Sequence, residues 1–343
     1  MKYTRAVLKA VDRLEIEEAA MPTPGDGELL IKVMASGICG TDVHIFHGGQ
    51  GSADIKFPMV LGHEYAGIVE QTGPNAGDFK VGDRVCVDPN ILCGHCYYCL
   101  NALGHFCENL VVSGVTLDGG FAQYAAVPFR AAYLIADDVP FEAGAMAEPL
   151  ACCLHGIDMC NIQNGDSVVV MGGGLIGLLM VQLARLQGAA RVVLVEPSAQ
   201  KRAFGAQLGA DICIDPFNED VKAVLAKAGV ARVNAVIECV GKPSTIELAI
   251  DIAGKRSVVM MFGLTEPDEM ISVKPFEIFR KEIEIKSSFI NPYTIGRAVS
   301  LINAKKIDTT SMITEIVPLA RLQEVLTNEE MRSRGKFVVA PWG

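Results

Sequence analysis

The sequence predicts two domains of different class: a β-rich, barrel-like domain and an α/β domain built on a doubly wound parallel sheet. Three observations predict this division. The chain has 343 residues, which is more than one hydrophobic core usually spans. The first 150 residues are rich in Gly and Pro, with short β-branched runs between them. From about residue 152, apolar runs alternate with helix-like segments, as in parallel βαβ units.

The first part of the chain predicts short strands separated by turns. The expected strands cover Leu29–Val33, Ile68–Glu70, Arg84–Val87 and Val111–Val115. The glycine-rich stretch from Gly40 to Gly51 is expected to be a loop. Loops on a rigid scaffold often carry functional sites, so this stretch is a candidate for one.

The second part predicts strands and helices in alternation. Ser167–Met171 is an almost continuous apolar run, as expected of a strand that is covered on both faces. The other expected elements are a helix over Leu175–Gly188, a strand over Arg191–Glu196, a helix over Gln200–Leu208, and strands over Ala235–Val240 and Ser257–Phe262. We expect this domain to cover residues 152–288.

The last segment of the chain, residues 289–343, ends in a strand-like run at Phe337–Val339. We expect this tail to rejoin the first domain. That domain is then discontinuous and consists of residues 1–151 and 289–343.

The composition argues against two classes of partner. The net charge is −10, from 30 Lys and Arg against 40 Asp and Glu, so no excess of basic residues is present to neutralise nucleic-acid phosphates. No run approaches the ~18 apolar residues that indicate a membrane span, and the N-terminus lacks a secretory pattern. We therefore expect a soluble, cytoplasmic protein with no nucleic-acid or membrane partner.

A dinucleotide-binding motif opens the α/β domain. Gly172-Gly173-Gly174-Leu175-Ile176-Gly177 fits the pattern G-x-G-x-x-G, and it lies directly between the first predicted strand and helix. In this pattern Gly172 permits a tight turn, Gly174 lets the backbone approach a pyrophosphate, and Gly177 lets helix and strand pack closely. The N–H groups at the start of the helix, from Leu175 and Ile176 onward, favour a phosphate. This predicts a Rossmann domain.

The second strand of this domain ends in Glu196, 19 residues after Gly177. A carboxylate at this place accepts hydrogen bonds from the adenosine ribose hydroxyls and repels a 2′-phosphate. The predicted cofactor is therefore NAD rather than NADP. Lys201 and Arg202 follow closely and would weaken that preference.

The chain has 11 cysteines, and four of them form a cluster. Clustered cysteines in a reducing compartment point to a metal, and the spacing Cys93-x2-Cys96-x2-Cys99-x7-Cys107 suits a closed, tetrahedral, structural zinc site. An iron–sulfur cluster is the alternative, but the bacterial ferredoxin pattern has a shorter last gap followed by Pro. We expect a structural zinc lobe over residues 90–110.

A second set of metal-binding residue types is spread along the first domain. Cys39 lies in the run Gly-Ile-Cys-Gly-Thr-Asp-Val-His, His63 and Glu64 lie in Gly-His-Glu-Tyr-Ala-Gly, and Glu148 lies in Ala-Glu-Pro-Leu. Their distances along the chain do not by themselves establish a site. These segments resemble the zinc-dependent medium-chain dehydrogenase/reductase family, and the resemblance covers essentially the whole chain with the motifs in the right order.

The resemblance implies a GroES-like catalytic domain joined to the Rossmann domain, and a catalytic zinc in addition to the structural one. It implies that Cys39 and His63 ligate the catalytic zinc, and that Glu64 is either a direct ligand or an adjacent carboxylate. Glu148 occupies the place of a third cysteine in classical alcohol dehydrogenases. A Glu there resembles the sorbitol dehydrogenase branch, and it would bind the metal directly or through water.

The resemblance also implies a chemistry. Zinc acts as a Lewis acid that stabilises the alkoxide of an alcohol, which then gives hydride to NAD. Thr41 would accept the hydroxyl proton and pass it through the cofactor ribose toward His44, as a similar relay is thought to do in the family. The predicted function is oxidation of a secondary alcohol, with a polyol or sugar alcohol as the expected substrate.

Several alternatives stay open at this point. Threonine dehydrogenases share the Cys-Gly-Thr-Asp-Val-His run, so a 3-hydroxy amino acid is the nearest rival substrate. The Arg-Tyr pair of animal sorbitol dehydrogenases is absent from Phe289-Ile290-Asn291-Pro292-Tyr293, where Asn291 is either a substrate contact or a turn residue. Phosphorylated polyols would need a cation such as Lys56 or Arg297.

Three other classes are less well supported. A non-enzymatic relative of the family is disfavoured because all four candidate ligands of the catalytic zinc are present. The cysteine lobe and Cys39 argue against a zinc-free reductase, and the acidic charge argues against a zinc-finger nucleic-acid binder. The family resemblance implies a homodimer or homotetramer formed through the edge of the Rossmann sheet, for which Ser257–Leu264 is the candidate.

Overall fold

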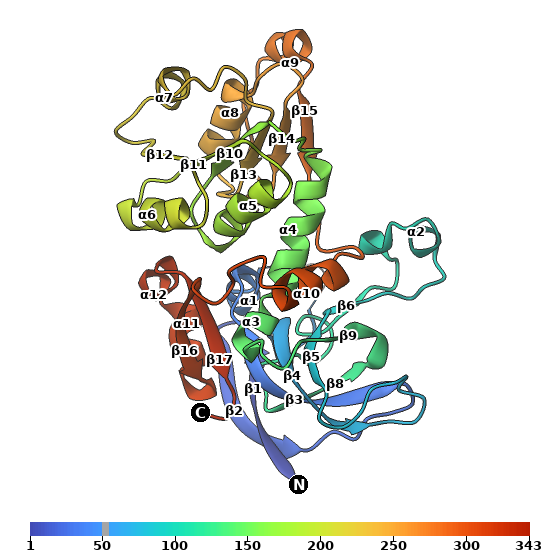
Figure 1. Ribbon diagram of the computed structural model, residues 1–343. Helices are drawn as coiled ribbons and strands as arrows, with labels where there is room; N and C mark the ends of the chain where they lie inside the picture. Colours follow the sequence, from blue (N-terminus) through green and yellow to red (C-terminus); the bar gives the residue numbers. More distant parts are fainter. Residues whose placement is uncertain (50–54) are drawn as a thin grey trace. The chain divides into compact units, whose positions relative to one another are not determined.

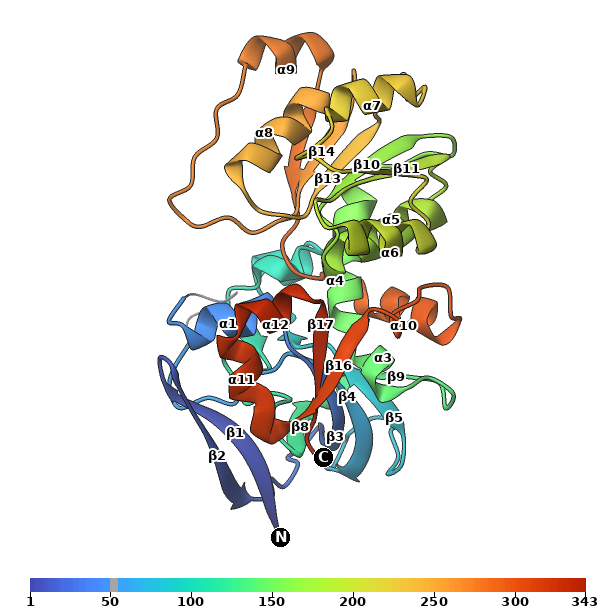
Figure 2. The same cartoon turned by 90° about the vertical axis from the view of Figure 1, so that its left-hand side faces the viewer.

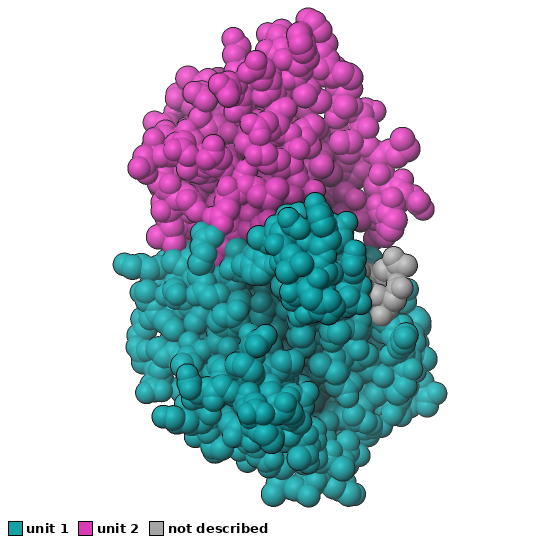
Figure 3. Space-filling model, turned by 90° about the vertical axis from the view of Figure 1, so that its right-hand side faces the viewer, with its two compact units in different colours: residues 1–151, 291–343 teal, residues 152–290 magenta. Residues whose placement is uncertain are grey.

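The computed structural model describes residues 1–49 and 55–343. The chain forms two compact units: residues 1–151 with 291–343, and residues 152–290. Figure 3 colours the first unit teal and the second magenta. Each unit has its own hydrophobic core of buried side chains.

The first unit is built on a seven-stranded sheet in the order β16-β17-β3-β4-β5-β9, with β8 paired to β3. Two further two-stranded sheets pair β1 with β2 and β6 with β7. The strands are β1 (Lys2–Ala10), β2 (Arg13–Ala20), β3 (Glu28–Gly37), β4 (Glu64–Thr72), β5 (Arg84–Val87), β6 (Asn90–Ile91), β7 (Val111–Val112), β8 (Tyr124–Pro128), β9 (Ala132–Leu134), β16 (Ile313–Pro318) and β17 (Lys336–Ala340).

Short helices connect these strands (Figure 1). They are α1 (Gly40–Phe46), α2 (Tyr97–Leu100), α3 (Phe141–Ala145), α4 (Ala147–Met159), α10 (Ile295–Asn303), α11 (Leu322–Thr327) and α12 (Glu329–Ser333), with 3₁₀ turns η1 (Gly104–Phe106), η2 (Phe129–Ala131) and η3 (Leu319–Arg321). Helix α4 continues past residue 151 into the second unit.

The tail joins the first unit through backbone pairing. β17 is antiparallel to β3, with Val338 opposite Gly37 and Val339 opposite Ser36, and it is parallel to β16. Residues 336–339 are all buried, as expected of an apolar, β-branched strand in the middle of a sheet. The strand-like run that the sequence indicated at Phe337–Val339 is confirmed.

The second unit is a six-stranded, all-parallel sheet in the order β12-β11-β10-β13-β14-β15. In Figures 1 and 2, α5 and α6 lie on one face of this sheet, and α7 and α8 on the other. The strands are β10 (Ser167–Met171), β11 (Arg191–Val195), β12 (Ile212–Ile214), β13 (Ala235–Glu238), β14 (Val258–Met261) and β15 (Glu284–Ser287), and the helices are α5 (Leu175–Leu186), α6 (Ala199–Gln207), α7 (Val221–Lys227), α8 (Pro243–Ile252) and α9 (Pro275–Lys281). This is the doubly wound arrangement of a Rossmann fold.

Two expectations from the sequence are wrong. The stretch expected to be a loop forms helix α1 over Gly40–Phe46, because Asp42 caps its first turn and Ile45 and Phe46 are buried; its last residues, Gln50 and Gly51, lie outside the described residues. The run Ser257–Leu264 is not the sheet edge, because β14 lies between β13 and β15.

Within the described ranges, 1–49 and 55–343, we find no helix that is both long enough and apolar enough to cross a bilayer.

Candidate functional site

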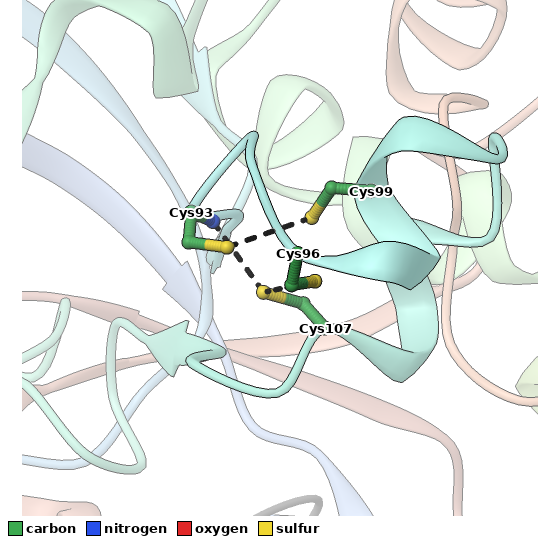
Figure 4. Close-up of side chains that lie close together, drawn as sticks. All are labelled: Cys93, Cys96, Cys99 and Cys107. Atoms are coloured by element: carbon green, nitrogen blue, oxygen red, sulfur yellow. Dashed lines mark hydrogen bonds between the residues drawn. The ribbon is translucent and has the colours of Figure 1, made fainter.

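The four clustered cysteines converge in the first unit, in a lobe between β6 and β7. Figure 4 shows the four side chains pointing toward one another, with α2 and η1 supplying the backbone between them. Their sulfur atoms all lie within 4.8 Å of one another. All four are free thiols rather than disulfides.

The spacing of these sulfurs fits a tetrahedral zinc. Zn–S bonds of about 2.3 Å at tetrahedral angles place two sulfurs about 3.8 Å apart. The Sγ atoms of Cys93 and Cys99 lie 3.9 Å apart, and those of Cys96 and Cys107 lie 4.0 Å apart. The backbone N–H of His95 lowers the pKa of the Cys93 thiol to about 6, which favours the thiolate that a metal requires.

A second group of ligand atoms forms around the start of β4. Cys39 precedes α1, His63 precedes β4, and Glu64 is the first residue of β4, where it pairs with Gly37 of β3. The ligand atoms of Cys39, His63 and Glu64 all lie within 4.8 Å of one another. One sulfur, one imidazole nitrogen and one carboxylate oxygen form a donor set that suits a zinc site with an open position.

Asp42 orients this group, and the sequence reading assigned it no role. Its side chain is fully buried, and its Oδ2 accepts a hydrogen bond from the backbone N–H of Cys39 at 2.9 Å. Its Oδ1 accepts one from the N–H of Gly62 at 3.2 Å and lies 3.3 Å from Nδ1 of His63. Burial by itself lowers the pKa of His63, but the Asp42 carboxylate and Cys39 together outweigh it and hold the pKa well above its usual value. A carboxylate behind a ligating His fixes the ring orientation.

Lys336 is the second residue that sequence reasoning missed. This first residue of β17 forms a buried ion pair with Glu64 and donates to the carbonyl of Ile38 at 2.9 Å. Burial lowers the pKa of Lys336, but Glu64, Cys39 and Asp42 together raise it by more, so the net shift is upward. Gly37 makes room for this pair, since a Cβ there would lie 2.1 Å from Oε2 of Glu64.

The expected proton relay residues lie beside this group on α1. The hydroxyl of Thr41 is 3.7 Å from the sulfur of Cys39. His44 follows three residues later, and residues at this spacing share one face of a helix. Both side chains are partly exposed.

Glu148 lies in the first turn of α4 and is 8% exposed. It does not join the group of Cys39, His63 and Glu64 within the same 4.8 Å limit among the described residues. A role as a ligand, direct or through water, stays a prediction.

The Gly-rich turn of the second unit has the geometry that a dinucleotide needs. Gly172 has a φ of +96°, and a Cβ on Gly177 would lie 1.8 Å from the carbonyl oxygen of Gly172. At Gly174 an added Cβ would meet no atom within 4 Å, so the backbone there faces open space. Helix α5 starts directly afterwards with Leu175 and Ile176.

Glu196 follows β11 and is 6% exposed. Its Oε2 accepts a hydrogen bond from the N–H of Gly173 at 2.6 Å, and its Oε1 accepts one from the N–H of Ser198 at 2.8 Å. The carboxylate is therefore fixed beside the Gly-rich turn, at the place where an adenosine ribose is held in such folds.

Asn291 is buried and hydrogen-bonded to other side chains of the protein. It is 2% exposed. Its amide donates to Asp88 at 3.2 Å and accepts from Asn90 at 2.5 Å. Burial raises the pKa of Asp88 to about 6. Of the two roles considered for Asn291, the geometry favours that of a turn residue over that of a substrate contact.

The two cations considered for a phosphorylated substrate, Lys56 and Arg297, are both exposed. Neither belongs to either group of candidate metal ligands.

Comparison with known proteins finds two family models in this chain. Residues 25–137 match the alcohol dehydrogenase GroES-like domain, and residues 176–304 match the zinc-binding dehydrogenase model. The chain is 36% identical to an L-threonine 3-dehydrogenase of Thermococcus kodakarensis over 88% of its length and 86% of the relative's. It is 33% identical to D-arabinitol dehydrogenase 1 of Uromyces fabae over 95% and 93% of the two chains.

A solved structure is also similar. The crystal structure of a zinc-binding dehydrogenase from Sinorhizobium meliloti, bound to NADP, is 37% identical. It superposes with a TM-score of 0.94 over 99% of this chain and all of that one.

Proposed function

The chain belongs to the zinc-dependent medium-chain dehydrogenase/reductase family, in its polyol dehydrogenase-like branch, and we propose that it oxidises a secondary hydroxyl of a polyol with NAD. The observation that carries this proposal is the convergence of Cys39, His63 and Glu64 on one point of the first unit. An open zinc site of mixed S, N and O ligands is the type that polarises an alcohol.

We infer that Cys39 and His63 hold the catalytic zinc and that Glu64 and Glu148 supply carboxylates beside it. The ion pair with Lys336 favours Glu64 as an adjacent carboxylate, because the ammonium group withdraws one of its oxygens from a metal. When bound, zinc would supply a Lewis acid that favours the deprotonated alcohol, and NAD would supply the acceptor for the hydride of the carbinol carbon.

The remaining steps fall to side chains of α1. Thr41 accepts the hydroxyl proton of the substrate as it gives up its own, and His44, on the same face of the helix, passes a proton on toward solvent. Asp42 holds His63 and the Cys39 backbone in place, so the zinc ligands need not reorganise during the reaction.

We propose NAD as the preferred cofactor because the Glu196 carboxylate, held beside the Gly-rich turn, would repel a 2′-phosphate. The similar structure from Sinorhizobium meliloti is bound to NADP. The direct test compares kcat/KM with NAD and with NADP, for the native chain and for Glu196→Ser. We expect NAD to be preferred by the native chain, and the preference to shrink or reverse in the variant.

The two hypotheses, a polyol substrate and a threonine substrate, involve the same chemistry and differ only in the substrate. Arabinitol and the C3 position of threonine both offer secondary hydroxyl groups, and relatives named for each are similar to this chain. The buried Glu148, at the position that resembles the sorbitol dehydrogenase branch, favours a polyol over a simple alcohol, and turnover with L-threonine distinguishes the remaining rival.

The deciding experiment incubates the purified protein with NAD or NADP and with polyols, polyol phosphates, 3-hydroxy amino acids and simple secondary alcohols. We expect NADH formation with polyols, abolished by a zinc chelator and by Cys39→Ser. Turnover with L-threonine alone would assign the rival function. Silence across the panel by a protein that contains zinc and binds NAD would overturn the proposal.

A further inference from the structure

Glu238 is a buried carboxylate that the proposed chemistry does not use. It is the last residue of β13 and is 0% exposed. Its Oε1 accepts hydrogen bonds from the N–H groups of Val240 at 2.7 Å and Gly241 at 3.0 Å, and from the hydroxyl of Thr245 at 2.9 Å. A fully buried carboxylate is costly unless such donors compensate it, so this side chain fixes the turn that follows β13.

This turn is packed against the one that follows β14. The carbonyl of Glu238 accepts hydrogen bonds from the N–H groups of Phe262 at 2.9 Å and Gly263 at 2.8 Å. A Cβ on Gly241 would lie 2.2 Å from the carbonyl oxygen of Leu264, and one on Gly263 would lie 2.2 Å from the nitrogen of Gly241. Residues 238–241 and 262–264 therefore form a single wall in which Glu238 holds both turns.

The wall lies beside the Gly-rich turn. β13 is the neighbour of β10 on the side opposite β11, as Figure 1 shows. Val240 is 39% exposed, and a Cβ on Gly172 would lie 2.9 Å from its Cγ2. Strand order reverses at β10 and β13, which is where ligands bind at the carboxyl ends of the strands in doubly wound sheets.

The direction of the dinucleotide follows from this order. Glu196, at the end of β11, marks the adenosine ribose, and the start of α5 after β10 marks the pyrophosphate. The second nucleoside must then lie on the other side of β10, over the ends of β13 and β14. The exposed apolar side chain of Val240 is the part of the wall that it would contact.

We propose that Glu238 is a positioning residue for the nicotinamide half of the dinucleotide, and that it acts through the Val240–Gly241 turn. This inference rests on the proposed use of NAD. The backbone N–H groups that face the Glu238 carboxylate in the turn, those of Val240 and Gly241, can only donate. A Gln at this position would keep an acceptor at Oε1 but put a donor NH₂ in place of Oε2, which lies 3.2 Å from the nitrogen of Gly241. Two donors would then face each other, and the Val240–Gly241 turn would shift.

The test measures the binding of NAD and of AMP to the full chain by calorimetry, for the native protein and for Glu238→Gln. AMP contains only the half of the cofactor that lies over β11 and α5. We expect the Kd for NAD to rise about tenfold or more, as the loss of one satisfied buried hydrogen bond implies, and the Kd for AMP to stay within about twofold. If Glu238 had a purely structural role, the substitution would weaken the binding of NAD and of AMP together.

Two further variants make the result specific. Asp211 precedes the edge strand β12 of the same sheet, and its carboxylate accepts a hydrogen bond from the N–H of Val192 at 2.7 Å. The control variant Asp211→Asn should lower stability without changing the ratio of the two Kd values. Thr245→Val removes one donor to Glu238 and serves if Glu238→Gln does not fold. This variant should raise the Kd for NAD but not for AMP, by a smaller factor than Glu238→Gln does.

The outcomes separate this inference from the proposed function. If Glu238→Gln or Thr245→Val weakens the binding of NAD and of AMP equally, or weakens neither, the positioning role is overturned. The use of NAD is left intact in either case. Failure of the native chain to bind NAD at all overturns both.

Discussion

Lys336 and Glu64, 272 residues apart in the sequence, form an ion pair that is almost completely buried. Their side chains are 4% and 1% exposed. The pair ties the first residue of β17 to the first residue of β4, next to Cys39 and His63. The returning tail therefore supports the candidate catalytic zinc site directly.

We expect Lys336→Met to destabilise the protein strongly, by about 3–5 kcal/mol in the free energy of unfolding, because it leaves the Glu64 charge buried without its partner. The double variant Glu64→Gln/Lys336→Met should recover much of that loss. Chemical denaturation of all four forms of the cycle, with zinc content measured in parallel, gives the coupling. If the effects of the two substitutions on the free energy of unfolding were strictly additive, Glu64 and Lys336 would not stabilise each other as an ion pair.

A second prediction concerns Asp42. Asp42→Asn keeps an acceptor for the backbone N–H of Cys39 but removes the charge beside His63. Loss of such a carboxylate typically costs about 10–100-fold in metal affinity. Titration with a competing chelator should release one zinc per chain more readily than from the native protein, while the zinc of the four-cysteine lobe is retained. Equal release of both zincs would show a general loss of stability instead.

Much of the second unit could be predicted because its signals are local. The strand Ser167–Met171, the Gly-rich turn and the start of α5 are contiguous in the sequence, and the structure places all three as expected. The four-cysteine lobe is equally local, with its ligands confined to residues 93–107.

What the sequence could not supply are contacts between distant segments. Lys336 meets Glu64, and Asn291 meets Asp88, only because the tail returns to the first unit. Helix α1 was mistaken for a loop because the glycines of the stretch Gly40–Gly51 masked the capping by Asp42. Strand β2 was missed because half of Arg13–Ala20 is charged, and its cross-strand ion pair between Glu17 and Arg5 appears only in the fold.

The raised pKa of Asp88 predicts a pH dependence of stability. Its pKa is about 6 in the folded chain against 3.8 for the free side chain, so between these values the folded state holds a proton that the unfolded state has lost. The contribution of Asp88 to stability therefore falls as the pH rises through this window, and the full cost is present above it. The shift corresponds to a cost of about 3 kcal/mol.

Asp88→Asn should remove this cost, since an amide oxygen still accepts from the Asn90 N–H and the Asn291 amide. We expect the variant to be more stable than the native chain at pH 8, and the difference to shrink by about half at pH 5. Denaturation curves of both proteins at the two pH values test this, because other titrating groups cancel in the comparison. A difference that is constant with pH would refute the assignment.

The cysteine lobe should matter for stability rather than for the chemical step, because four thiolates leave no open position on a zinc. We expect Cys107→Ser to lower the zinc content by about one ion per chain, and the midpoint of thermal unfolding to fall. Protein that remains folded should keep its turnover. A matched substitution, Cys213→Ser, lies outside both ligand groups and should leave the zinc content unchanged. Loss of turnover with full stability would place the reactive metal in this lobe instead.

The last prediction addresses the proton relay. Thr41→Ala removes the hydroxyl beside Cys39 but none of the candidate metal ligands, so we expect kcat to fall about 100-fold, the usual scale for a lost proton-transfer group, with both zincs retained. Thr41→Ser keeps the hydroxyl and should stay near native activity. The effect should also weaken as the pH is raised, since solvent base can then remove the proton. Native turnover in Thr41→Ala would exclude Thr41 from the relay, and loss of zinc in that variant would assign the hydroxyl to holding Cys39 rather than to moving a proton.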